Sequence, residues 1–319
     1  MKPNSFLENI FSIRNDYFNK IITVLGIKIK LKRSISFELF EKYLNTFVDI
    51  RLAPKATGQL RKMQLLELHL MKELRRFCDE IGVKYWLRGG TALGAYRHKG
   101  FIPWDDDVDL GMMREDFDKL KDYINNNSNT YEITSFYNTN ALSKVMKFTF
   151  KNVEGGVFVD IFTFDWCSYD NPDNFWAKWL KDKKELQEKL KCLNVGTRAY
   201  AKDIPPELLK KIEDINNEYK NRYMNSPHKT AICSAIEQID DRGHKRIYPY
   251  DMIFPLKQIE FEGEQYYIMN RTEDFLENHY GKNYIQFPIL EALSPHGYMF
   301  TEEHREKIEQ LYEKYIKEA

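Results

Sequence analysis

Four aspartates in the short stretch Pro103–Leu110 (PWDDDVDL) have the type and spacing of ligands for a hard divalent cation. Residues two apart in an extended strand point to the same side, so Asp107 and Asp109 present both carboxylates on one face. Val108 and Leu110 then face the other way and anchor the strand in the core. Like charges this close repel unless a cation lies between them, and Mg²⁺ prefers carboxylate oxygens. The pattern therefore predicts a magnesium site.

Two other structures carry aspartates at this spacing. A solvated acidic turn is common for Asp-rich loops, but the apolar residues on either side favour a strand. A calcium loop of the EF-hand type would use Asp105, Asp107 and Asp109 as its first ligands. That loop then requires a glycine and, six residues later, a glutamate, whereas this chain has Leu110 and Asp116 at the two positions. The sequence excludes the calcium loop.

A further carboxylate stands alone in a strongly apolar run. Asp160 is the sole charged residue of the segment 157–164, and a buried carboxylate is costly unless it is paired, hydrogen-bonded or bound to a metal. We expect Asp160 to lie on a strand beside Asp107 and Asp109. There it would complete a site for one or two Mg²⁺ ions, or orient and deprotonate an acceptor hydroxyl. A partner arginine in the core is the alternative, and Asp165 is the competing candidate.

A glycine pair precedes the aspartates. Gly89 and Gly90 follow a predicted strand, where they permit positive φ and a close approach of the backbone. Thr91 can cap or begin a short helix at 92–98. Because the N-terminus of a helix offers backbone N–H groups to anions, this turn predicts a phosphate-binding site next to the carboxylates.

Five cationic side chains are candidates for contacts with a diphosphate. Arg97 and Lys99, with Arg88, surround the glycine turn and the short helix. Lys144 and Lys147 lie on a predicted strand, where an odd step of three places them on opposite faces, so we expect one of the two to reach the site. For Arg88, Arg97 and Lys99, a solvated basic surface is the alternative.

Apolar periodicity predicts the elements that position these residues. Helices are expected at 36–49, 58–81, 92–98 and 114–125, and strands at 83–87, 107–112, 131–137, 143–150 and 157–164, with Gly82 as a helix stop and a loop at 125–130. Strands interleaved with helices favour an α+β (mixed α/β) core at about 58–165. Helices follow at 174–193, 206–223 and 301–318, and the segment 261–287 is mixed.

Composition restricts the class of protein. The formal net charge of zero argues against a generally basic nucleic-acid binder. The four cysteines form no Cys-x-x-Cys pair, which favours reduced thiols over disulfides or a zinc site. No apolar run is long enough to span a bilayer and the first twenty residues do not form a signal peptide, so we expect a cytoplasmic protein. Ile27–Arg33 alternates apolar and basic residues, which predicts an edge hairpin or strand, or a segment that contacts the anionic inner face of the plasma membrane.

Leu87–Met112 (LRGGTALGAYRHKGFIPWDDDVDLGM) closely resembles the signature of the LicD/fukutin family, in the nucleotidyltransferase-fold superfamily. The superfamily pattern is a Gly-Gly or Gly-Ser turn, an Asp-x-Asp strand and a later acidic residue, here Gly89-Gly90, Asp107-Val108-Asp109 and Asp160. Residues 261–288 resemble the family's C-terminal element, especially Phe261-Glu262-Gly263 and Tyr280-Gly281. Ile268–Arg271 stands where a proline is expected, and His296 is the candidate for a late histidine.

The resemblance implies a core with a small mixed sheet flanked by helices at 36–170, preceded by a basic-apolar segment at 1–35. A mainly helical acceptor-side region would follow at 171–319. It also implies transfer of a phospho-alcohol, most typically phosphocholine from CDP-choline, to a sugar hydroxyl of a cell-surface polysaccharide or lipopolysaccharide, with release of CMP.

The ions and donor contacts follow from the same resemblance. Mg²⁺, or Mn²⁺ in its place, would bind the three aspartates, and the donor would contact Gly89, Gly90, Thr91, Arg97, Trp104, Lys144 and Lys147. Trp104, Trp86 or Trp166 can hold the quaternary ammonium of choline by cation–π contact, with core packing as the alternative for each. Two rival functions remain open, a nucleotidyltransferase that moves a nucleoside monophosphate onto a small molecule and a non-catalytic scaffold.

Overall fold

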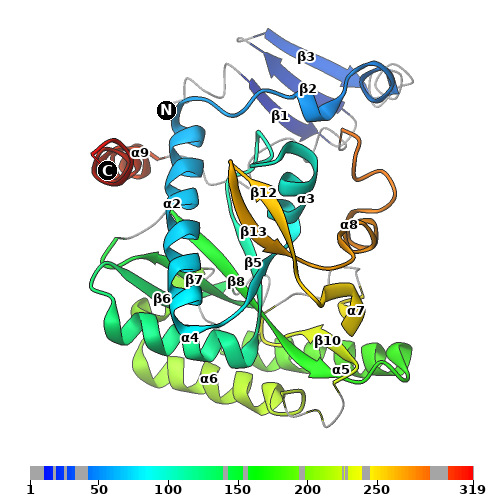
Figure 1. The fold of residues 1–319 in the computed structure, drawn as a ribbon, viewed down its shortest axis with the longest axis vertical. Helices are drawn as coiled ribbons and strands as arrows, with labels where there is room; N and C mark the ends of the chain where they lie inside the picture. The colour runs from blue at the N-terminus through cyan, green and yellow to red at the C-terminus, as the bar shows by residue number, and fades with distance from the viewer. Residues whose placement is uncertain are drawn as a thin grey trace.

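A mixed β-sheet forms the centre of the protein, with helices on both of its faces (Figure 1). The structure is a computed structural model that describes residues 11–16, 19–24, 27–32, 42–138, 143–153, 157–193, 198–224, 226, 229–238, 245–287 and 301–318. For the first three ranges it describes the backbone alone. The predicted α+β class, with a mixed sheet flanked by helices, is confirmed.

The central sheet comprises ten strands within the described residues. Its main path is β12 (Lys257–Phe261), β13 (Glu264–Ile268), β4 (Tyr85–Leu87), β5 (Asp109–Met113), β8 (Phe158–Cys167), β7 (Ser143–Phe150), β6 (Tyr131–Asn138) and β9 (Arg198–Tyr200). Two further strands, β10 (Ala231–Ser234) and β11 (Ile247–Pro249), extend from the end of β8. The pairs β5–β8 and β13–β4 are parallel, and the other pairs are antiparallel.

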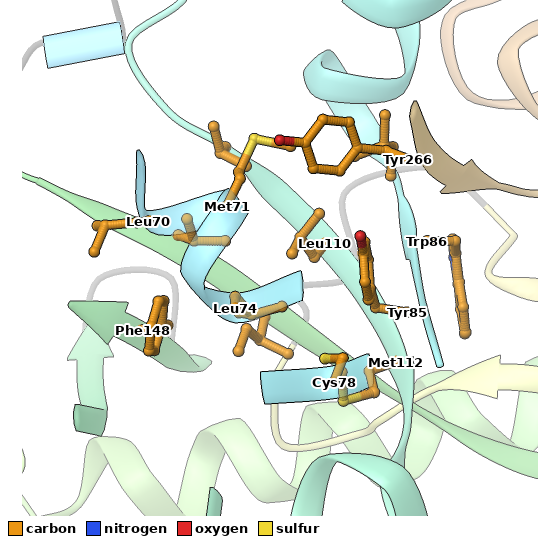
Figure 2. Packing of buried hydrophobic residues seen from close by; sticks show 14 of the residues in the cluster. Leu70, Met71, Leu74, Cys78, Tyr85, Trp86, Leu110, Met112, Phe148 and Tyr266 are labelled. Atoms are coloured by element: carbon orange, nitrogen blue, oxygen red, sulfur yellow. The ribbon is translucent and has the colours of Figure 1, made fainter. Parts of the chain in front are cut away.

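The long helix α2 (Gly58–Ile81) covers one face of this sheet. Its bounds are those that apolar periodicity predicts, and Gly82 ends it in the left-handed region at φ 71°, as expected. Figure 2 shows how it packs, with Leu70, Met71, Leu74 and Cys78 of α2 among Tyr85, Leu110, Met112, Phe148 and Tyr266 of the strands. Trp86 lies on the other side of β4 from Tyr85. Because side chains alternate along a strand, Asp109 points away from the α2 face that Leu110 occupies.

The remaining helices surround the sheet and the two ends of α2 (Figure 1). They are α3 (Gly89–His98), α4 (Arg114–Asn127), α5 (Pro172–Lys191), α6 (Pro206–Lys220), α7 (Tyr250–Ile253), α8 (Thr272–Tyr280) and α9 (Glu302–Tyr312), which continues into a π-turn at Glu313–Lys317. Glu309 of α9 accepts hydrogen bonds from Gln59 and Lys62. The last described helix is therefore fastened to the first turns of α2.

Several boundaries differ from the predicted ones. The strand expected from Asp107 begins at Asp109, so Asp107 lies in the extended segment that precedes β5. The loop expected from Asn125 begins after Asn127. Residues 42–47 are helical, and the first residues of the helix predicted at 36–49 fall outside the described part. His296 also lies outside it.

The sheet is larger than the small one expected, because the region after residue 170 contributes β9 to β13 to it. These strands are three to five residues long, too short for clear alternation of apolar and polar side chains. The division at about residue 170 stays a prediction.

The N-terminal strands form a separate sheet. β1 (Phe11–Asp16), β2 (Asn19–Val24) and β3 (Ile27–Lys32) are antiparallel, with β3 at one edge. The strand predicted from the Ile-Lys alternation is thus confirmed. Among the residues described, no helix has the length and apolar character needed to cross a membrane. All four cysteines are free thiols, as predicted.

Candidate active site

Two of the predicted carboxylates lie side by side on neighbouring strands. In the parallel pair β5–β8, Asp109 is in register with Asp160, and the Asp160 N–H donates to the carbonyl of Val108 at 2.8 Å. Adjacent strands are about 4.8 Å apart, and residues in register point to the same face. Asp107 precedes this pair by two residues. The chain thus brings the three predicted aspartates to one end of two central strands.

The start of α3 lies against the same carboxylates. Gly89 has φ 55°, and a Cβ atom there would overlap Oδ2 of Asp109. A Cβ at Gly90 would lie 2.7 Å from Oδ2 of Asp105. The missing side chains therefore allow the carboxylates to approach the N-terminus of the helix, whose first N–H groups have no partner within the helix. Phosphate oxygens would be held by the same N–H groups.

Thr91 joins α3 to the aspartate strand. The Asp109 N–H donates to Oγ1 of Thr91 at 2.8 Å, and the Arg88 N–H donates to the carbonyl of Asp109 at 3.1 Å. The helix begins at Gly89 with Arg88 as its N-cap, so the prediction of Thr91 is wrong by three residues for the cap and by two for the first helical residue. The hydroxyl of Thr91 instead fixes the distance between the glycine turn and β5.

Lys147 is the buried cation of the site. Its Nζ lies 2.6 Å from Oδ1 of Asp160, and its side chain is 3% exposed. Burial raises the pKa of Asp160, and the charges of Lys147 and Arg88 oppose that rise. Lys144 points to the other face of β7, as the odd spacing predicts, and pairs with Glu213 at 2.8 Å. Burial lowers the pKa of Lys144 to about 8.

Arg88 is the second cation near the carboxylates. Its guanidinium lies 4.0 Å from Oδ2 of Asp109 and 4.0 Å from the centre of the Phe162 ring. Arg97 is directed elsewhere, because its Nη1 donates to the carbonyl of Tyr284 at 2.9 Å. Burial lowers the pKa of Arg97 to about 10. Lys99 is exposed at the far end of α3, 3.5 Å from Glu260.

Asp165 can be removed from the candidates. It lies five residues after Asp160 on β8, and Arg114 binds both of its oxygens at 2.6 Å. Arg114 also donates to Glu237 at 2.7 Å. The core arginine that was the alternative explanation for Asp160 therefore belongs to Asp165, on the opposite face of the strand.

The three tryptophans occupy different environments. Trp86 is fully buried between Phe164 and Phe254. Trp166 stacks on Tyr250 near the far end of β8, about six residues beyond Asp160. Trp104 is partly exposed next to the aspartates, with its ring centre 6.4 Å from that of His98. Of the three, Trp104 is the one that directly precedes the aspartates in the chain, and its role stays a prediction.

Glu67 of α2 is a fourth carboxyl group that sequence reasoning did not single out. It is fully buried, and neither of its oxygens has a hydrogen-bond partner in the part of the chain that is described. Burial raises the pKa of Glu67 well above its usual range, and Asp107, Asp106 and Asp105 raise it further. A sequence signal exists, because Glu67 falls on the apolar stripe of α2, four residues after Met63 and three before Leu70.

Tyr280 of α8 brings the C-terminal part of the chain to the same place. It is 40% exposed. Loss of hydration raises the pKa of its phenol, with Asp109 and Asp105 adding to the rise. Helix α8 contacts α3, so the Tyr280-Gly281 motif at the end of α8 comes near the glycine turn from a region that is remote in sequence.

A divalent cation fits this site in donor chemistry. The available groups are carboxylates, the glycine turn leaves space beside Asp109 and Asp105, and Glu67 has two buried oxygens without partners. As the side chains are placed, no three Asp, Glu, His or Cys residues of the described segments lie close enough to hold one ion together. The ligand set Asp107, Asp109 and Asp160 therefore stays a prediction.

Comparison with known proteins covers the part of the chain that holds these residues. Residues 82–193 match the family model LicD/FKTN/FKRP, nucleotidyltransferase domain. The lipopolysaccharide cholinephosphotransferase LicD of Haemophilus influenzae is 27% identical over 254 residues, which cover 74% of this chain and 95% of that protein. The ribitol 5-phosphate transferase FKRP of Homo sapiens is 49% identical over 53 residues, or 15% of this chain and 11% of FKRP. The ribitol-5-phosphate transferase FKTN of Mus musculus is 36% identical over 75 residues, or 24% and 15% of the two chains.

The family-model match includes the glycine turn, Asp109, Asp160 and the strands that carry them, since residues 82–193 extend from the end of α2 to the end of α5. The resemblance found in Leu87–Met112 is thereby confirmed. The chain is thus similar to the LicD/fukutin family, and its residues 82–193 match that family's nucleotidyltransferase domain.

Proposed function

We propose that this protein transfers a phospho-alcohol, phosphocholine from CDP-choline, to a sugar hydroxyl of a cell-surface polysaccharide or lipopolysaccharide, with release of CMP. The observation that carries the proposal is the register of Asp109 and Asp160 on parallel strands, packed against the glycine start of α3. Carboxylates next to a helix N-terminus can hold a divalent cation and a diphosphate at adjacent positions. The similarity to LicD over most of both chains supports choline as the head group.

The chain's own residues bind and orient the donor in this proposal. The N–H groups at the start of α3 hold phosphate oxygens, and Arg88 and Lys147 reduce the negative charge of the cluster. Asp107, Asp109 and Asp160 would hold Mg²⁺, with Mn²⁺ as a substitute. The ion, when bound, neutralises the diphosphate and stabilises the charge that develops on departing CMP.

The reaction is a displacement at phosphorus. The sugar hydroxyl oxygen attacks the phosphorus that bears the choline, and a new P–O bond forms. The bond from this phosphorus to the bridging oxygen breaks, and CMP leaves with the bonding electron pair. The hydroxyl proton passes to a carboxylate of the cluster and on to solvent. Positioning of the two oxygens in line supplies much of the rate enhancement.

Trp104 is the residue that we assign to the choline ammonium. Trp86 is fully buried and Trp166 is covered by Tyr250, whereas Trp104 is partly exposed and adjacent to Asp105. Cation–π contact with a tryptophan contributes about 0.5–2 kcal/mol. Ribitol lacks a positive charge, so the contact would favour choline over ribitol.

A panel of donors tests the proposal. The purified protein is incubated with Mg²⁺, an oligosaccharide acceptor and CDP-choline, CDP-ethanolamine, CDP-ribitol or CDP-glycerol, and CMP release and head-group transfer are followed. We expect transfer from CDP-choline. Transfer from CDP-ribitol alone would show that the head group is ribitol phosphate and not phosphocholine. Release of pyrophosphate from a nucleoside triphosphate would show that the protein is a nucleotidyltransferase.

A pair of variants connects this activity to the site. Asp109→Asn removes a carboxylate of the cluster and is expected to reduce CMP release by about 10²–10³-fold. Asp116→Asn is the control, since Asp116 accepts the Lys84 N–H at 3.1 Å in the first turn of α4 and lies outside the cluster. Equal activities of the two variants would contradict the assignment of Asp109 to the active site.

A further inference from the structure

Glu67 is a buried carboxyl group that would be stabilised by a positively charged partner. It is fully buried on α2, and both of its oxygens lack hydrogen-bond partners within the described residues. An ionised carboxylate without a partner is costly in the interior, and other buried carboxyl groups of this chain are paired, such as Asp165 and Glu237 with Arg114. Glu67 is instead surrounded by carboxylates, with Asp107 as the strongest electrostatic neighbour and Asp106, Asp105 and Asp160 after it.

The aspartate segment passes between α2 and α3. On the α2 side, Nε2 of Gln64 donates to the carbonyl of Asp105 at 2.9 Å and lies 3.4 Å from the carbonyl of Ile102. On the α3 side, Gly90 lies against Oδ2 of Asp105. Glu67 is one turn after Gln64 on the same face of α2, the face that contacts this segment.

We propose that Glu67 is a further ligand of a divalent cation at the Asp105–Asp107 segment, so that the ion is held between α2 and the segment. The inference rests on the proposed cation dependence of the enzyme and extends it to a residue outside the aspartate motif. A cation would give the buried Glu67 oxygens the partner that they lack, and it would offset the repulsion among neighbouring carboxylates.

The competing arrangement is a Glu67 that carries a proton and has no ligand. The two arrangements differ in their response to Glu67→Gln. Glutamine has nearly the shape of a protonated glutamate, so it would leave cation binding unchanged if Glu67 only fills space. If Glu67 is a ligand, the substitution removes one negative oxygen donor and weakens binding.

The experiment measures binding of Mg²⁺ alone by calorimetry and of Mn²⁺ alone by electron paramagnetic resonance, without nucleotide. We expect Glu67→Gln to weaken cation binding by at least about tenfold or to remove one bound ion per chain. We also expect the rise in melting temperature produced by saturating Mg²⁺ to be smaller in the variant than in the wild type. Equal affinity, stoichiometry and melting shift in the two proteins would overturn the inference.

A matched control and a second variant complete the design. Asp182→Asn removes a carboxylate that is 9% exposed on α5, where it pairs with Lys178 and Arg222. It should lower stability and leave cation affinity unchanged. Where Glu67→Gln does not fold, Glu67→Asp keeps the charge and withdraws it by one methylene, and a several-fold loss of affinity is expected, whereas unchanged affinity would contradict the inference.

The two proposals fail in different ways. The wild-type protein could bind neither Mg²⁺ nor Mn²⁺ and still transfer phosphocholine in the presence of a chelator. That result would contradict both the cation dependence of the reaction and the inference about Glu67. If the wild-type protein binds the ions, but no more tightly than the Glu67→Gln variant does, only the inference about Glu67 is wrong.

Discussion

Lys147 and Lys144 provide a comparison at the scale of single residues, because both lie on β7 and pair with a carboxylate. Lys147 is 3% exposed and pairs with Asp160, which is 13% exposed, whereas Lys144 and Glu213 are 15% and 31% exposed. Breaking a buried ion pair leaves an uncompensated charge, which costs about 3–5 kcal/mol, and a partly solvated pair costs less. The difference in solvation therefore predicts a difference in stability.

We expect Lys147→Met to lower the free energy of unfolding by about 3–5 kcal/mol, and Lys144→Met to lower it by about 1 kcal/mol. Urea unfolding of both variants without added divalent cations measures the two values. Similar losses in the two variants would mean that Asp160 finds another partner when Lys147 is removed.

Gly89 combines a restricted backbone with restricted space. At φ 55° an alanine is strained by about 1 kcal/mol, and its Cβ would overlap Asp109. Gly58 has a similar φ of 62° but no atom within 4 Å of a Cβ position. Gly89→Ala should therefore lose stability and most of the CMP release, whereas Gly58→Ala should lose about 1 kcal/mol of stability and keep its activity. An active Gly89→Ala enzyme would show that the close approach of α3 to the carboxylate is not required.

At the scale of elements, the turn between β12 and β13 connects three parts of the chain. Glu262 in this turn receives hydrogen bonds from Arg61 of α2 at 2.8 Å and from Lys55 at 2.7 Å, and its side chain is 4% exposed. It also accepts the Phe101 N–H just after α3. The Phe261-Glu262-Gly263 motif therefore holds the hairpin against the helices that position the glycine turn and the aspartates.

The pH dependence of stability tests this connection. Burial alone would raise the pKa of Glu262, but the bonds from Arg61 and Lys55 outweigh burial and lower it. A lowered pKa in the folded state stabilises the protein above the unfolded pKa, and the contribution disappears as the pH falls through the folded value. Glu262→Gln should therefore cost about 1–3 kcal/mol at about pH 7 and progressively less below about pH 4.5, measured by urea unfolding. A cost that stays constant over this range would contradict the ion-pair interpretation.

Local patterns predict elements of this fold better than they predict how the elements meet. Helix α2 and strand β7 have their predicted bounds, because an apolar stripe and alternating side chains are local properties of the chain. The lone charge at Asp160 likewise points to the site. Glu67 and Tyr280 reach the same site through packing of α2 and α8, and the short strands β9 to β13 become strands by pairing with distant partners, which no local window contains.

For the whole molecule, the shared sheet implies that the region after residue 170 is needed for folding. Without it, β8 would lose β10, and β4 would lose β13. Exposed, apolar strand edges promote association between chains. We expect residues 42–170 expressed alone to aggregate or to unfold without a cooperative transition, as measured by size-exclusion chromatography and circular dichroism. A monomer with cooperative unfolding would instead support an independent core.

The parallel contact between β13 and β4 also has a consequence for the time course of synthesis. Ile268 pairs with Leu87, so β4 emerges from the ribosome about 180 residues before its neighbour exists. At about 5–20 residues per second, this interval lasts roughly 10–35 s. Through that interval the strand that leads into the glycine turn has an uncovered edge, and the nascent chain is open to chaperones. The aspartates of the candidate site are translated early, but the sheet around them is complete only after residue 268 has been made.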